Sequence, residues 1–229
     1  MGTAERKERE KESRKESIID AAQKVFFEKG LLLATMEEIA ERAELAKGTL
    51  YLYYKSKEDL YLAVMIRGLN ILCAMFESII AQPQPFIATL VRLIDAYTTF
   101  YEQHKNYFRM LHFFQTPQFH KQVSDEMKEA GRQVDSRLWE IAIAQLKRGI
   151  LEGKLRRDID PAEMAIMFWS NTTTLLLRID TQLDFWRDRM NVDLQHTLKI
   201  SQTLMLESVL TEEGKKEYHE FIYSETRDR

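Results

Sequence analysis

The segment at residues 35–60 constrains the fold of this chain most, because signals for the start of a helix recur in it at short intervals. Thr35 and Glu38 form a capping box, in which the Thr35 hydroxyl accepts the backbone N–H of Glu38 and the Glu38 carboxylate accepts that of Thr35. Apolar residues then follow at the spacing of one buried helix face, through Ala43. The pattern predicts a helix of two turns that begins after Thr35.

Two more helices are predicted directly after this one. Residues 44–46 form the connection, residues 47–54 form the next helix, and Ser56 is the N-cap of another, with Asp59 at its third position. Helices of two turns bury too little area to be stable alone, so we expect neighbouring helices to hold them. This spacing is typical of a helix-turn-helix, whose second helix enters the major groove of DNA.

The residue types at 47–57 suit contact with DNA. Gly48 costs about 1 kcal/mol of helix stability relative to Ala but leaves room for another backbone, while Thr49 and Tyr51 offer hydroxyl groups and apolar surface to base edges. Lysines can meet phosphates, and of Tyr53 and Tyr54 we expect one to donate to a phosphate and the other to be buried. The predicted DNA-binding residues are Thr35, Lys47, Gly48, Thr49, Tyr51, Tyr53, Tyr54, Lys55 and Lys57.

Three motifs follow one another in this part of the chain. They are Ile18-Ile19-Asp20-Ala21-Ala22 with Phe26-Phe27-Glu28-Lys29-Gly30, then Thr35-(x3)-Ile39-Ala40-(x2)-Ala43, then Lys47-Gly48-Thr49-Leu50-Tyr51-(x)-Tyr53-Tyr54-Lys55-Ser56-Lys57-Glu58-(x)-Leu60. With these motifs at this spacing, residues 17–66 resemble the DNA-binding domain of the TetR (tetracycline repressor) family. The resemblance implies an all-helical homodimer that binds a palindromic DNA operator and is released by a small molecule.

The chain departs from that family's pattern at two positions. Glu44 stands in the turn before residue 47, where the family usually has Gly, and a left-handed backbone there would cost about 1 kcal/mol of strain. Ala46 stands where the family commonly has Ser or Thr, so the side-chain cap is lost at the start of the recognition helix, the predicted helix at 47–54 that would enter the DNA groove. Both departures predict a recognition helix that is held loosely before it meets DNA.

The charge of the chain is not that of a typical DNA-binding protein. The net charge is −3, and residues 1–60 hold 12 Lys and Arg against 13 Asp and Glu. The acidic residues Glu37, Glu38 and Glu41 lie on the helix that need not enter the groove, so the basic groups around residues 47–57 can still meet phosphates. We therefore expect a modest salt dependence, with log K falling by about 0.9 per decade of salt for each neutralised phosphate.

Helical patterns continue through the rest of the chain with few breakers. A helix is predicted at 56–81, another from Phe86, a short one at 106–114, and a long one from 123 to 152 with Gly153 at its C′ position. Asp160 is predicted to cap a helix at 161–181, with Pro161 at its first position, and a further helix is predicted at 192–210. The single cysteine, Cys73, excludes an intramolecular disulfide, and we expect its thiol to be buried.

The fold class is therefore all-α, with an N-terminal three-helix helix-turn-helix domain and a larger helical ligand-binding and dimerisation domain. We expect residues 1–16 to be a charged arm that is flexible or extends the first helix. Residues 17–62 are predicted to be the DNA-binding domain and residues 63–229 the regulatory domain, ending in a solvated helix from residue 212.

Two helices have the pattern of dimerisation surfaces. The predicted helix 161–181 is apolar on nearly every face from Met164 to Trp169, and Leu175 to Leu177 continue the run. Residues 192–210 combine apolar residues with small serines that allow close helix approach. Paired about a two-fold axis they would form a four-helix interface; the alternative is that they only fill a monomer core. The interface candidates are Met164, Phe168, Leu175, Leu194, Leu198, Ser201, Met205 and Ser208.

Aromatic residues and a few polar groups gather in the middle of the chain, as in the pockets that bind small hydrophobic molecules. Aromatic stripes on helices are also typical of a plain core, and that alternative stays open. The effector class expected is hydrophobic rather than highly charged. The pocket candidates are Phe100, Tyr101, His104, Phe108, Leu111, Trp139, Phe168, Asn171 and Thr172.

Other classes of protein have little support in the sequence. The histidines do not take the spacing of a metal motif, and no Gly-rich phosphate loop or GxSxG motif is present, so we expect no enzyme, metal ion or cofactor. The apolar run at 164–169 is far shorter than the roughly 20 residues of a membrane helix, and the chain opens with charged residues rather than a signal peptide. We expect a cytoplasmic protein without a membrane partner. The alternative function is a ligand-independent repressor, or an activator gated by a protein partner.

Overall fold

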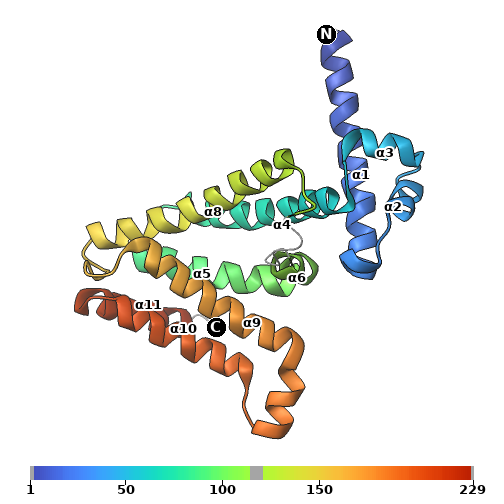
Figure 1. The fold of residues 1–229 in the computed structure, drawn as a ribbon. Coiled ribbons are helices and arrows are strands. Elements are labelled where there is room, and N and C mark those ends of the chain that lie inside the picture. The colour runs from blue at the N-terminus through green and yellow to red at the C-terminus, as the bar shows by residue number, and fades with distance from the viewer. Residues whose placement is uncertain (1–2, 114–120, 228–229) are drawn as a thin grey trace. The chain divides into compact units, whose positions relative to one another are not determined.

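The computed structural model describes residues 3–113 and 121–227, and these residues are almost entirely helical (Figure 1). The predicted all-α class is confirmed. Within the described residues the only β-structure is an isolated bridge between Leu155 and Leu210. The helices are α1 (Thr3–Leu33), α2 (Met36–Arg42), α3 (Lys47–Tyr53), α4 (Lys57–Ile80), α5 (Phe86–Gln103), α6 (Lys105–Phe113), α8 (Asp125–Leu151), α9 (Pro161–Met190), α10 (Leu194–Val209) and α11 (Glu212–Arg227).

The charged N-terminal arm is helical. Residues 3–16 belong to α1, where charged side chains pair along the helix, Arg6 with Glu10 at 2.8 Å and Lys15 with Glu12 at 3.1 Å. Pairs at these spacings stabilise a helix by a few tenths of a kcal/mol each. Of the two forms expected for the arm, the structure has the one that extends the first helix.

The chain divides into two compact units. The first comprises Met1–Ile71 with His104–Ser136, and the second comprises Leu72–Gln103 with Arg137–Arg229. Helices α4 and α8 each continue from one unit into the other. The first unit is thus larger than the DNA-binding domain predicted at 17–62, and those domain bounds stay a prediction.

The core of the first unit joins the short helices to α1 and α4. Ile18, Leu50 and Leu60 are fully buried, and the rings of Phe26 and Tyr61 meet edge to face with their centroids 5.2 Å apart. Burial of a leucine or isoleucine side chain contributes about 1.5–3 kcal/mol. This packing supplies the stability that α2 and α3 lack by themselves.

The core of the second unit is formed by α5, α8, α9, α10 and α11. Gly149 of α8 permits the close approach of α5, because a Cβ at that position would lie 2.2 Å from Cζ of Phe86. The core cluster consists of Phe86, Ile87, Leu90, Leu146, Leu155, Met164, Ala165, Leu206, Val209, Leu210 and Tyr218.

The predicted end of α8 and the predicted start of α9 are both confirmed. Gly153 has a left-handed backbone with φ of +72° after the end of α8, as expected for a glycine at C′. The Asp160 carboxylate accepts the backbone N–H groups of Ala162 and Glu163, and Pro161 occupies the first position of α9. These signals act within a few residues, and so they can be read from sequence.

Two C-terminal elements differ from the predictions. Helix α9 runs nine residues past the predicted end at 181 and stops at Asn191, which has φ of +51°; its added part mixes charged and apolar residues and contains pairs such as Arg187 with Asp184 at 2.7 Å. Helix α11 is more than a solvated helix end. Tyr218 is buried and Phe221 packs against the core of the second unit.

Helix α4 has the length and hydropathy of a membrane span, but its contacts are those of a core helix. Leu60, Val64, Leu72 and Cys73 on it have no exposed surface, so the predicted burial of the Cys73 thiol is confirmed. Core helices that are buried on most faces commonly have such a composition.

Candidate nucleic-acid interface and effector cavity

The capping box at the start of α2 is present as predicted. The Thr35 hydroxyl accepts the backbone N–H of Glu38 at 3.2 Å, and the Glu38 carboxylate accepts the N–H of Thr35 at 3.2 Å. A hydrogen bond from the Lys29 ammonium at 2.5 Å lowers the pKa of Glu38. Thr35 is exposed, so its hydroxyl proton can still be donated to a partner.

The turn between α2 and α3 has both of the predicted weaknesses. Glu44 has φ of +55°, a left-handed conformation that is strained for a residue with a Cβ. Ala46 is the N-cap of α3 and makes no side-chain hydrogen bond there. The recognition helix therefore begins without the two local features that would fix it most firmly.

The outer face of α3 combines a cation with apolar surface. The Lys47 ammonium lies 5.9 Å from the ring centroid of Tyr51 and pairs with Glu37. Gly48 has open space around its missing Cβ, and Tyr51 is 44% exposed. Leu52, which the sequence analysis did not single out, is 82% exposed. On its inner side α3 is held by the buried Leu50.

The structure separates the other predicted DNA-binding residues. Lys55 is exposed, and Thr49 and Tyr53 are half-buried. Tyr54 is buried, and burial raises its pKa to about 12. Of the two tyrosines, Tyr53 is the one whose side chain is open to a phosphate.

Lys57, predicted to bind DNA, makes contacts within the chain instead of standing free at the surface. Its ammonium donates to the carbonyl groups of Leu31, Leu32 and Ala34, at 2.9, 3.4 and 3.1 Å. These are among the carbonyls that a helix end leaves unpaired, and a lysine is a common partner for them. Lys57 thus caps the C-terminal end of α1, and its assignment to DNA binding stays a prediction.

Helix α4 is tied to α1 by a charged cluster within the first unit. The Arg67 guanidinium donates to Glu16 at 2.6 Å, Asp20 at 2.7 Å and Gln23 at 2.9 Å. The Tyr107 hydroxyl of α6 donates to the same Gln23 side chain at 2.6 Å. Planar, multidentate contacts of this kind fix geometry as well as adding energy, so α4 and α6 hold α1 in a defined position.

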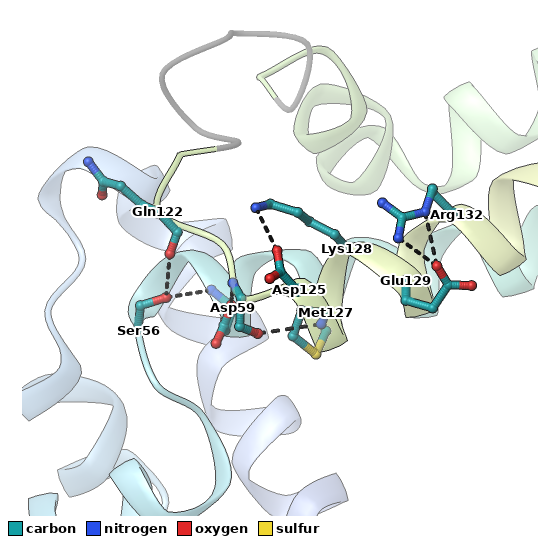
Figure 2. A network of polar contacts seen from close by, with 9 residues as sticks. Ser56, Asp59, Gln122, Asp125, Met127, Lys128, Glu129 and Arg132 are labelled. Carbon is teal, nitrogen blue, oxygen red and sulfur yellow. Dashed lines mark hydrogen bonds and ion pairs between the residues drawn. The ribbon is translucent and has the colours of Figure 1, made fainter.

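The start of α8 is tied to the start of α4, as Figure 2 shows. The Asp59 carboxylate, 2% exposed, accepts the backbone N–H of Ser124 at 2.7 Å. The Ser56 hydroxyl accepts the N–H of Asp59 at 3.0 Å, which confirms its predicted capping role, and donates to the carbonyl of Gln122 at 3.3 Å. Asp59 was predicted only as part of the cap, and its bond across 65 residues could not be read from a local pattern.

The second unit contains a partly open cavity of about 90 Å³ between α5, α8 and α9, with Phe76 of α4 at one side. Two tryptophans form part of its wall, Trp139 and Trp169, whose ring centroids are 5.6 Å apart. The Tyr97 ring stacks on Trp169 at 4.4 Å. The lining residues are Phe76, Leu90, Leu93, Ile94, Tyr97, Leu138, Trp139, Ala142, Gln145, Leu146, Ala165, Phe168, Trp169 and Thr172.

Three of the nine predicted pocket residues line this cavity: Trp139, Phe168 and Thr172. The other six do not. Phe100, Tyr101 and Phe108 are buried elsewhere in the core, and His104 and Leu111 are half-buried residues of the first unit. Asn171 faces α10, where its side-chain oxygen accepts the Ser201 hydroxyl at 2.7 Å.

The predicted dimer residues are divided between core and surface. Met164, Leu194 and Leu198 are buried within the single chain, so we remove these three from the interface set. Phe168, Leu175, Ser201 and Met205 are half-buried, and Ser208 is exposed. Helices α9 and α10 lie side by side (Figure 1), and their exposed apolar residues are Ile166, Met167, Phe185, Met190, Ile200 and Leu204.

Comparison with known proteins finds similarity to bacterial regulators. Residues 18–64 match the family described as bacterial regulatory proteins, tetR family. The HTH-type transcriptional repressor KstR2 of Rhodococcus jostii is 28% identical over 168 residues, which cover 73% of this chain and 80% of that protein. The HTH-type transcriptional activator FasR of Mycolicibacterium smegmatis is 30% identical over 101 residues, 44% of this chain and 46% of that protein.

The fold is also shared with solved structures. The regulator FadR of Bacillus subtilis, solved with stearoyl-CoA, superposes with a TM-score of 0.62 at 20% identity, covering 84% of this chain and 98% of that one. The ketosteroid regulator KstR2 of Mycobacterium tuberculosis superposes with a TM-score of 0.59 at 20% identity, covering 87% and 96%. At this level of identity the likeness extends to the fold alone.

Proposed function

Because this chain belongs to the tetR family of bacterial DNA-binding transcriptional regulators, we propose that it acts in the cytoplasm as a homodimer on a palindromic operator. We further propose that it is a repressor released from DNA by a small hydrophobic effector. The observation that carries the first part is the outer face of α3, where Lys47, Gly48, Tyr51 and Leu52 lie together on an exposed surface.

At the DNA, α3 is the recognition helix in this proposal. Gly48 lets the helix approach the base edges closely, while Tyr51 and Leu52 supply apolar contact of the kind that thymine methyl groups accept. Lys47, Lys55 and Tyr53 contact phosphates, together with the exposed hydroxyl of Thr35 at the start of α2. Lys47 exchanges its pair with Glu37 for a phosphate, which reduces the net gain from that contact.

The dimer forms through the exposed apolar residues of α9 and α10. Met167, Ile200 and Leu204 are 46%, 45% and 62% exposed in the single chain, and apolar surface gathered on one helix pair is typical of an interface. A two-fold axis through such an interface places two recognition helices one DNA turn apart, ~34 Å, or a multiple of it. A Leu204→Asp variant should sediment as a monomer, whereas Leu32→Asp, at an exposed position of α1, should not change the mass.

The cavity of the second unit is the proposed effector site. Its wall is apolar and aromatic, which suits a hydrophobic molecule. At about 90 Å³ it is smaller than the ~300–1,000 Å³ of typical ligand pockets, so a larger effector extends out of its open side or displaces the helices around it. Of two proteins of similar fold, one was solved with stearoyl-CoA and the other is titled a ketosteroid regulator, and an acyl chain and a steroid both belong to this class.

Displacement of the cavity wall supplies the release mechanism. Phe76 lies on α4, and Leu138 to Leu146 lie on α8. Both helices continue into the first unit, where Lys57, Asp59 and Arg67 bind them to the DNA-binding elements. A 100-fold loss of operator affinity needs ~2.7 kcal/mol of coupling between the two sites. Equal separations of the recognition helices in the operator-bound and effector-bound dimers would contradict this mechanism.

A selection from a random-sequence duplex library tests the DNA-binding proposal. The wild-type protein and Tyr223→Ala, an exposed tyrosine of α11, should enrich the same inverted repeat, and Tyr51→Ala should not. Enrichment of nothing by any of the three proteins, or of the same sequences by all three, would show that α3 does not read bases.

A ligand-independent regulator gated by a protein partner is the second candidate. The small size of the cavity favours it, and the activator FasR among the relatives leaves the sign of regulation open. Operator binding that no hydrophobic compound weakens, at concentrations that saturate the cavity, would select this candidate.

A further inference from the structure

One polar group stands apart in the cavity wall. The side-chain oxygen Oε1 of Gln145, on α8, is buried, and within the described residues it accepts no hydrogen bond. The other polar groups near it are satisfied differently: the Tyr97 hydroxyl bonds the Thr173 hydroxyl at 2.7 Å. Buried polar atoms in proteins are nearly always paired, and Gln145 is a lining residue of the cavity, so its oxygen is suited to a donor group of a ligand that shifts the side chains covering it.

The wall around Gln145 excludes charged ligand groups. None of the fourteen described lining residues carries an ionisable acid or base other than Tyr97, and burial raises the pKa of that phenol and keeps it neutral. A carboxylate or phosphate in the cavity would lose hydration and gain no counter-ion, which disfavours its binding there. It would also offer no proton to the Gln145 oxygen.

We propose that Gln145 is the specificity-determining anchor of the effector cavity, and that the cavity selects an uncharged apolar group bearing one hydrogen-bond donor, a hydroxyl or an N–H. The proposal rests on the effector site proposed above and deepens it. A larger effector with an anionic part places that part outside the cavity. A matching donor gains a bond that an isosteric methyl group cannot make.

Small fluorinated aromatics test the proposal by direct binding, without DNA. 4-Fluorophenol, 4-fluorotoluene and 4-fluorobenzoate have one ring in common and present a donor, a methyl group and a carboxylate. Their affinities are measured by ¹⁹F NMR titration of the full chain and of two variants, Gln145→Leu and Gln133→Leu. Gln133 is an exposed residue of the same helix and serves as the matched control.

The quantity compared is the preference for the phenol, which is the ratio of the dissociation constants of 4-fluorotoluene and 4-fluorophenol for one protein. The hydration free energy of each probe is the same in all three titrations, so it does not affect the comparison of this ratio between proteins. The preference should fall about tenfold in Gln145→Leu and stay unchanged in Gln133→Leu, and the benzoate should bind weakest to all three proteins. Gln145→Leu should also unfold at a higher temperature than wild type without any probe, since an unpaired polar group has been removed from the interior. This second measurement does not depend on ligand binding.

Two results would overturn the inference, and they differ in what else they affect. If phenol and toluene bind but their preference is the same in Gln145→Leu, or if the benzoate binds as well as the phenol, the anchor role is wrong and the effector cavity stands. If no probe binds any of the proteins, the effector site itself fails together with the inference. The library selection with Tyr51→Ala then decides separately whether the DNA-binding function holds.

Discussion

Replacement of Glu44 by glycine should stabilise the protein, although it removes a side chain. Glu44 has φ of +55°, and a left-handed backbone costs a residue with a Cβ roughly 1–2 kcal/mol. Glycine has no such cost, but it adds about 0.5–1 kcal/mol of unfolded-state entropy. The difference predicts a net gain of about 0.5–1 kcal/mol for Glu44→Gly.

The matched control is Glu44→Ala, which removes the same exposed side chain and keeps the strain. For a chain of this length, 1 kcal/mol corresponds to about 2–4 °C in the unfolding temperature, so Glu44→Gly should unfold a few degrees above Glu44→Ala in circular dichroism. Asn191, the other non-glycine residue with positive φ among those described, provides a second comparison. Asparagine tolerates this conformation, so Asn191→Gly should gain less. Equal unfolding temperatures for Glu44→Gly and Glu44→Ala would refute the strain argument.

Three further predictions concern stability and DNA binding. Gly48→Ala, with open space around its new methyl group, should raise stability by about 1 kcal/mol through helix propensity and weaken operator binding in a gel-shift assay; tighter binding would contradict the close approach proposed for α3. Gly149→Ala should lower the free energy of unfolding by about 1–3 kcal/mol, because its methyl group would overlap the Phe86 ring, and urea unfolding with Gly48→Ala as the comparison measures this. The lowered pKa of Glu38 means that its pair with Lys29 adds stability above pH 4.5 that is lost as the pH falls through the folded-state value. Lys29→Met should therefore differ from wild type in unfolding temperature near neutral pH and converge with it in acid; a difference that persists in acid would have another cause.

Local signals in the sequence were sufficient to predict most of the helices and several of their ends. Each local signal depends on residues within four positions, as for the caps at Thr35, Ser56 and Asp160 and the turn at Gly153. The resemblance of residues 18–64 to the tetR family depends on contiguous motifs. The strained turn at Glu44 was expected because the tetR family usually has Gly at this position.

What the sequence did not reveal depends on contacts between distant residues. Periodicity shows that Met164 and Leu194 lie on apolar faces, but not that those faces pack inside the single chain. A lysine at position 57 looks the same in the sequence whether its ammonium binds a phosphate or the carbonyl groups at the end of α1. Gln145 carries no signal at all, since a glutamine on an amphipathic helix is ordinary until its surroundings are known. The prediction ended α9 at residue 181, although Leu183, Trp186 and Met190 continue at helical spacing.

The continuity of α4 has a consequence for protein engineering. The DNA-binding segment of such a regulator is commonly thought of as a module that can be exchanged, and residue 62 is a natural place to join two parents. A chimera joined there would take Glu16, Asp20 and Gln23 from one parent and Arg67 from the other. The seam has to fall beyond Arg67, inside an uninterrupted helix, and the Ser124 partner of Asp59 and the Tyr107 partner of Gln23 must come with the DNA-binding parent. Exchangeable parts of this protein are therefore defined by bonding partners, and they are discontinuous along the chain.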